Sequence, residues 1–190
     1  METKNYSKID VNLDEFTGNI VTILPDLAEM NNYQTKSAVR RYLVDMGKTI
    51  LPQLNKLLQS KNPRLRKEAS KIIDLIGNKE SIPTFISLLN DDESSVRWIA
   101  AEGLSHIGRD SIVPLLYAVI EHGNDHYLKL GARHVFLNLF SDEEKEEFRS
   151  LLISLKSNSY LSITAPFEAF RALISFKHLS FEAPKLVIAV

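Results

Sequence analysis

The sequence predicts an all-α fold, a right-handed superhelix built from about five helix pairs. Two observations lead to this prediction: marker residues recur with a shared period, and the apolar residues between them have helical spacing. Proline recurs every 31 residues, glycine after 30 and 31 residues, and one arginine after 31, at Pro52, Pro83 and Pro114, at Gly47, Gly77 and Gly108, and at Arg66 and Arg97. Three markers with a shared period indicate two-helix repeats that stack into a solenoid.

The third unit shows the plan of one repeat most clearly. Its first helix carries apolar residues at i, i+3, i+4 and i+7, from Ile82 to Leu89, and Pro83 lies in the opening turn, where its missing N–H costs no hydrogen bond. We expect Ser94 or Ser95 to cap the second helix and Gly108 to end it. The predicted buried stripe of that helix is Val96, Ile99, Ala100, Gly103, Leu104 and Ile107.

The remaining elements follow the same plan in chain order. A stripe from Phe16 to Leu27 predicts a helix that Pro25 kinks or ends, and 36–46 is its partner. Further pairs are expected at 51–59 with 63–76, where Asn62 is the N-cap, and at 112–121 with 127–140. Ser141 begins the next helix, and the last begins at 164–166 and carries Phe167, Phe170, Leu173 and Ile174. The expected division is a frayed leader (1–12), one solenoid domain (13–178) and a tail (179–190).

The repeat residues resemble those of HEAT-like repeats, in the short variety named after phycobilisome lyases. The similarity lies in Val96-Arg97, Ala100, Ala101, Leu104, Ile107, Gly108 and Pro114, and one unit earlier in Arg66, Ala69, Ile73, Ile76, Gly77 and Pro83. It extends over about 15–177, and the fourth unit departs from it with Lys129 in place of Arg and Phe140 in place of Gly. The resemblance implies a HEAT/armadillo-like solenoid in which Arg97 reaches Asp91, Asp92 or Glu93.

Composition restricts the class of protein and of partner. The formal net charge is −1, which gives no overall attraction to nucleic acid, and the chain has no cysteine for disulfides or thiolate metal sites. The N-terminal residues lack a signal-peptide pattern, and the apolar runs are too short to span a bilayer. We therefore expect a cytoplasmic protein without membrane contact, for which nucleic acid is a disfavoured partner.

No catalytic motif emerges from the sequence. Gly47-Lys48-Thr49 lacks the first glycine of a phosphate loop, because position 42 is Tyr42. His122 and His126 have an i, i+4 spacing and His134 follows in the next helix, but Gly123-Asn124-Asp125 places the first two in a loop. Loop and groove histidines are commoner than metal sites, so we predict neither a metal nor a cofactor. HEAT-repeat hydroxylases with a di-iron site use His-Glu pairs, and this chain contains no His-Glu dipeptide.

The side of the second helices that faces away from the apolar stripe supplies the candidate binding residues. Trp98 lies on that side, and its position in the other units is held by Ser37, Lys67 and Leu130. We predict a concave groove that is basic at its N-terminal end and apolar around Trp98 and Leu130, formed by Arg40, Arg41, Lys67, Lys71, Trp98, Glu102, Leu130, Arg133 and His134. The alternative is that Trp98 packs on the neighbouring helix of the fourth unit.

The sequence therefore favours a non-catalytic scaffold or adaptor that binds another protein or a peptide in this groove, because a solenoid offers an extended surface without an enclosed pocket. An enzyme-class alternative is a phycobilisome-lyase-like subunit that assists covalent cofactor attachment. A second alternative is a DNA-binding relative of the HEAT-like alkylation-repair proteins, for which the basic stretch Lys61 to Lys71 would be needed.

Overall fold

A computed structural model describes residues 20–156 and 163–179, and the regular elements in these ranges are helices. The first helices of the four leading pairs are α1 (Ile20–Glu29), α3 (Leu51–Leu57), α5 (Ile82–Leu88) and α7 (Ile112–His122). Their second helices are α2 (Tyr33–Asp45), α4 (Pro63–Ile76), α6 (Ser94–Ile107) and α8 (His126–Leu139). Short 3-10 turns η2 (Gly47–Ile50), η3 (Lys79–Ser81) and η4 (Arg109–Ser111) join successive pairs. The fifth pair consists of α9 (Asp142–Glu147) and α10 (Arg149–Ser154) followed by α11 (Ala165–Leu179). The predicted all-α solenoid is confirmed.

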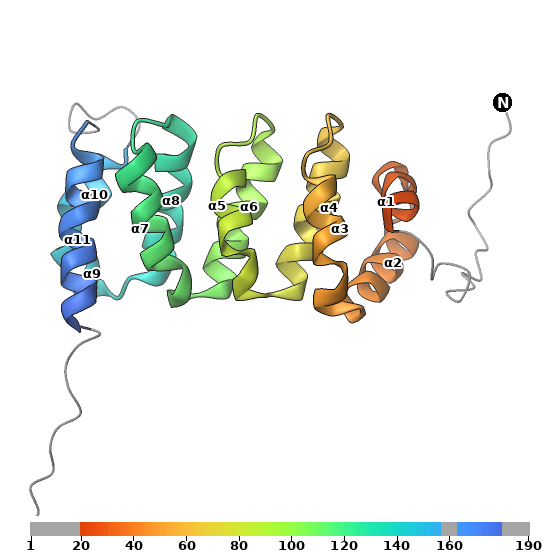
Figure 1. The fold of residues 1–190 in the computed structure, drawn as a ribbon, viewed down its shortest axis with the longest axis horizontal. Coiled ribbons are helices and arrows are strands. Elements are labelled where there is room, and N and C mark those ends of the chain that lie inside the picture. Colours follow the sequence, from red (N-terminus) through yellow and green to blue (C-terminus); the bar gives the residue numbers. More distant parts are fainter. Residues whose placement is uncertain (1–19, 157–162, 180–190) are drawn as a thin grey trace, which may run out of the picture.

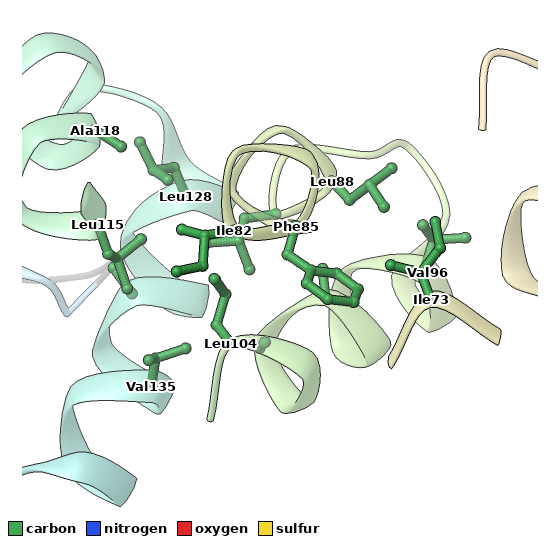
Figure 2. Packing of buried hydrophobic residues seen from close by; sticks show 14 of the residues in the cluster. Ile73, Ile82, Phe85, Leu88, Val96, Leu104, Leu115, Ala118, Leu128 and Val135 are labelled. Carbon is green, nitrogen blue, oxygen red and sulfur yellow. The ribbon is translucent and has the colours of Figure 1, made fainter. Parts of the chain in front are cut away.

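The helices form two rows (Figure 1). α3, α5, α7 and α11 lie in front in this view, with α4, α6 and α8 behind them. Along the rear row α2 contacts α4, α4 contacts α6, and α6 contacts α8. The core lies between the rows, and Phe85, Leu104, Leu115 and Val135 are among its buried side chains (Figure 2). The expected leader and the tail beyond Leu179 lie outside the described residues.

The repeat markers have the local roles that the sequence predicts. Among the described residues, positive φ occurs at Gly47, Gly77 and Gly108, with values of 60°, 63° and 87°, which is where a side chain would be strained. Asn62 caps α4 by accepting from the N–H of Arg64, and Pro63 follows at the first helical position. The period therefore reflects a turn that recurs at the end of each unit.

One predicted helix cap is wrong, and one of the two outcomes predicted for Pro25 is excluded. Neither Ser94 nor Ser95 caps α6; the cap is Glu93, whose carboxylate accepts from the Ser95 N–H at 3.4 Å and from its hydroxyl at 3.1 Å. Pro25 does not end α1, which continues to Glu29. Pro25 is exposed, while Leu24 and Leu27 on either side of it are fully buried, so tertiary packing keeps this short helix intact across the lost hydrogen bond.

The fifth pair reverses the order of the rows. α11, the second member in the chain, packs against α7 in the row of first helices, whereas α10 contacts α8 in the row of second helices. Phe140 replaces the glycine of earlier units at this point and stacks on Phe136 with ring centroids 5.0 Å apart. Phe148 and Phe176 extend the same aromatic cluster, at 5.3 Å and 5.7 Å from Phe140. The departure at Phe140 therefore marks the start of the end cap.

The predicted apolar face of the last helix is largely wrong. Leu173 is buried as expected, but Phe167, Phe170 and Ile174 are 62%, 50% and 43% exposed. The buried side of α11 is formed mainly by small residues, namely Ala165, Ala169 and Ala172, together with Leu173 and Phe176. Small side chains let two helices approach closely, and this explains the extensive contact of α11 with α7.

Gly103 permits a similarly close approach in the middle of α6. A Cβ atom at this position would lie 2.6 Å from Cζ of the buried Phe85 ring on α5. We expect Gly103→Ala to lower the free energy of unfolding by about 1–3 kcal/mol, although alanine favours an isolated helix by about 1 kcal/mol. Thermal and urea melts measure this change. Adding Phe85→Leu should recover part of the loss, and a G103A variant more stable than the parent would contradict the packing.

Candidate functional site

The exposed side of α2, α4, α6 and α8, hereafter the second-helix face, carries a hollow of about 340 Å³ between α6 and α8. Trp98 is 59% exposed and Leu130 is 41% exposed at its edge. We call this the Trp98 hollow; it is lined by Ser94, Arg97, Trp98, Ala101, Tyr127, Leu130, Gly131 and His134. The indole also contacts α8, since its ring centroid lies 4.9 Å from that of His134. Trp98 is thus held from one side by the neighbouring helix and open to solvent on the other.

Two of the predicted groove residues, Glu102 and His134, lie together beside this hollow. Nε2 of His134 lies 2.7 Å from Oε1 of Glu102, and Nδ2 of Asn138 lies 3.0 Å from the same ring nitrogen. Both Glu102 and His134 are about 30% exposed in their side chains, at 31% and 30%. These contacts fix the orientation of the His134 imidazole, and the Trp98 ring packs against this imidazole.

Arg97 forms the other edge of the hollow. Its Nη1 donates to the backbone carbonyl oxygens of Asp91 at 2.7 Å and Asp92 at 3.0 Å, and its guanidinium lies 3.8 Å from the centre of the Tyr127 ring. Arg97 was expected to reach Asp91, Asp92 or Glu93; it does reach the first two, but through their backbone. Their carboxylates are occupied by Arg66 of the preceding unit, which forms a two-pronged ion pair with Asp91 at 2.8 and 2.9 Å.

The contacts that Arg66 and Arg97 make with the turns follow a shared pattern along the solenoid. Arg66 also donates to the Ser60 carbonyl at 2.9 Å, in its own turn, as Arg97 does to Asp91. Its pKa is raised above the usual value mainly by the hydrogen bond to Asp91. Arg66 contacts the carboxylate of Asp91 in the next unit, whereas Arg97 stacks on the Tyr127 ring of its next unit. The Arg97 guanidinium is therefore positioned by two backbone carbonyls and an aromatic ring. Its positive charge therefore remains available at the edge of the Trp98 hollow.

The basic residues predicted for the N-terminal end of the groove have unequal surroundings. Arg40 and Lys71 both face the buried Glu68, with Arg40 Nη2 at 2.6 Å and Lys71 Nζ at 3.9 Å from its carboxylate oxygens. Arg41 is exposed, and Lys67 is partly exposed. Replacing Arg40 by an acid would set two carboxylates against each other in a buried place, so Arg41 and Lys67 are better positions for testing binding.

Arg133, also predicted for the groove, extends toward the fifth pair. Its Nε donates to the carbonyl oxygen of Leu152 in α10 at 3.2 Å. This hydrogen bond joins α8 to the reversed fifth pair and satisfies a carbonyl at the end of a short helix. Arg133 therefore contributes to the end cap.

Comparison with known families agrees with this architecture. Residues 50–136 match the model of the HEAT-repeat family, a segment that begins at Ile50 just before α3 and ends inside α8. This segment carries HEAT repeats. No curated protein and no solved structure matches the chain.

The HEAT-repeat segment contains the Trp98 hollow together with most of the second-helix face. HEAT repeats generally serve as scaffolds for protein interactions. The Arg66 and Arg97 turn contacts recur with the repeat and belong to its architecture, whereas Trp98, Tyr127 and Leu130 are particular to this region. No helix among the described residues is long and apolar enough to cross a membrane.

The three histidines considered as metal ligands have different partners. His134 faces Glu102, whereas the His126 ring packs edge-on against Tyr127 with centroids 5.2 Å apart. His122 lies next to Glu121, whose carboxylate is 3.8 Å away. Residues 20–156 and 163–179 contain no group of three or more metal-ligating side chains placed to hold an ion.

The sequence did not predict two features of the HEAT-repeat surface. Tyr127 and Arg97 join the Trp98 hollow, and a larger hollow of about 700 Å³ lies on the other row, between α5 and α7. Tyr117 stands in that second hollow, with Glu121 and Asp125 at its edge. The sequence signal for the second hollow was the four-residue spacing of Tyr117 and Glu121, which places both on one side of a helix. Periodicity alone does not reveal the distance between α5 and α7.

Proposed function

We propose that this HEAT-repeat protein is a non-catalytic scaffold or adaptor whose second-helix face holds a segment of another protein. The observation that carries the proposal is the indole of Trp98, which is 59% exposed beside a hollow of about 340 Å³. Large apolar groups at a folded surface mark interaction sites when they border a cavity that a partner side chain can fill.

The residue types around the hollow support the same role. Trp98, Tyr127 and Arg97 belong to the three residue types that most often dominate the energy of protein interfaces. They are also held in place: Arg97 by two carbonyls and the Tyr127 ring, and Trp98 by the His134 ring. Because these side chains are already ordered, little conformational entropy is lost when a partner binds.

We expect Trp98→Ala to weaken binding of the physiological partner by about 2 kcal/mol, which is roughly thirtyfold in Kd, because a central anchor is lost. Quantitative affinity purification with mass spectrometry identifies proteins retained by the parent and lost from W98A, and titration with the purified partner gives the Kd. Beforehand, iodide should quench the fluorescence of Trp98, the single tryptophan, in the free protein.

Tyr117→Ala is the matched control, since it removes a 42% exposed aromatic residue from the other row. It should leave capture unchanged. Loss of the partner from Y117A with full retention by W98A would move the binding site to the hollow between α5 and α7. A covalently bound tetrapyrrole on the captured protein would instead favour the lyase-like alternative.

A further inference from the structure

An excess of cations surrounds one buried carboxylate on the second-helix face. Glu68 of α4 has a side chain only 5% exposed and receives Lys36 Nζ at 3.1 Å and Arg40 Nη2 at 2.6 Å, both from α2. Lys71 Nζ, one turn along α4, lies 3.9 Å from the same carboxylate. We call Lys36, Arg40, Lys71 and Glu68 the Glu68 cluster. It holds three cations and one anion, so it carries a surplus of positive charge.

The cluster differs from a set of free surface lysines. Lys36 and Arg40 have side chains only 15% exposed, so their charges are partly desolvated and fixed in direction. Burial lowers the pKa of the Lys71 amine, and although Glu68 acts in the opposite sense, the charges of Arg40, Lys67 and Lys36 lower it further. An anion that approached these groups would relieve their mutual repulsion.

The cluster adjoins the Trp98 hollow. Lys67 on α4 and Trp98 on α6 occupy equivalent positions in consecutive units, and the two helices pack side by side. Packed helix axes lie about 8–10 Å apart, a distance that roughly three residues of extended chain can span. A single bound segment can therefore reach both places.

We propose that the Glu68 cluster, together with Lys67, binds the carboxylates of an acidic segment in the partner protein, next to the apolar residue held in the Trp98 hollow. This assignment relies on the proposed function for the neighbouring anchor, but the binding of acidic side chains can be tested separately. The buried Glu68 acts as an internal counter-ion that gathers and orients the cations. Two partner carboxylates would neutralise the cluster itself, and a third would pair with Lys67.

Acidic residues on the same helices limit the size of the anion. Asp45 follows Arg41 on α2, Asp74 follows Lys71 on α4, and Glu102 lies on α6. These charges would repel a long polyanion such as duplex DNA, whose phosphates extend far beyond the cluster. A short run of two or three acids fits between them, and this favours a protein segment as the ligand.

The test uses the full chain and fluorescein-labelled hexaglutamate as probe, with binding followed by fluorescence anisotropy at about 20 mM salt, where exposed charges are little screened. Lys67→Gln with Lys71→Gln should weaken binding about tenfold, because two attractive charges are removed while Lys36 and Arg40 still neutralise Glu68. The control is Lys56→Gln with Lys61→Gln, which changes the net charge equally away from the cluster and should alter binding less than twofold. Equal weakening in both double variants would overturn the proposal.

Amine acylation of the unmodified protein gives a second measurement that does not depend on a variant. Hexaglutamate should protect Lys67 and Lys71 and leave Lys56 and Lys61 reactive; uniform reactivity would contradict the site. A duplex of about 12 base pairs that binds more tightly than hexaglutamate, and is lost from the same double variant, would assign the cluster to a nucleic-acid backbone and refute the acidic protein segment. W98A should bind hexaglutamate like the parent, so failure of the anchor and failure of the cluster are distinguishable.

Discussion

Replacing Leu104 with Asp should unfold the protein. Leu104 is fully buried in the C-terminal half of α6, a helix that packs against α4, α5 and α8. The change removes an apolar side chain, which alone costs about 2–5 kcal/mol, and adds a carboxylate without a buried partner. The total of at least about 4 kcal/mol is comparable with the whole stability of a typical domain. Circular dichroism should show loss of the cooperative thermal transition.

Leu75→Asp is the matched control for this substitution. Leu75 lies on α4 and is 58% exposed, so the same chemical change should leave the melting temperature close to that of the parent. If L104D melts like the parent, the buried and exposed sides of the second helices have been assigned wrongly.

A chain that ends at Asp142 should aggregate. The truncation removes α10, α11 and nearly all of α9, and α11 is the element that packs against α7. Loss of this cover would expose the side of α7 that packs against α11 in the intact protein. Terminal units of solenoids keep such surfaces from solvent, and an uncovered apolar face associates with others like it. Size-exclusion chromatography with light scattering measures the outcome.

A point substitution can separate the role of α11 from the mere loss of chain length. Ala169→Glu places a charge at a fully buried position of α11 and should reproduce much of the destabilisation. Phe170→Glu alters a residue that is 50% exposed and should have little effect. A truncated chain that stays monomeric and melts like the parent would show that another element closes this end.

Much of the fold could be predicted because repeats transfer information from one unit to the next. The glycines at positions 47, 77 and 108 recur because each unit turns at the same place, and positive φ there favours glycine. The errors fall where the repeat weakens. In α11 the large residues Phe167 and Phe170 suggested a buried face, yet the side that packs is formed mainly by alanines, together with Leu173 and Phe176. When a helix has two apolar stripes, the helical period alone does not indicate which of them packs against the neighbouring helix.

The candidate binding surface was predictable to the extent that equivalent positions in consecutive helices become neighbours. Counting from Trp98 identified Leu130 as its equivalent, and the structure places both residues at the Trp98 hollow. The predicted groove residues Glu102 and His134 also lie beside each other. The same counting treated Arg40 as a free groove cation, because it ignores contacts between different positions of adjacent helices. Glu68 lies on the buried side of α4 and takes up Arg40 and Lys36 across the interface with α2. Ion pairs of this kind depend on how far long side chains extend between helices, and alignment of equivalent repeat positions gives no information about that.

The reversed order of the fifth pair affects how the protein forms during synthesis. In an ordinary solenoid each unit can fold against its predecessor as soon as it leaves the ribosome. Here α7 ends at His122, but its covering helix α11 begins only at Ala165. At about 5–20 residues per second, the intervening chain takes several seconds to emerge. Throughout that time one side of α7 has no covering helix, so chaperone binding matters most during this interval.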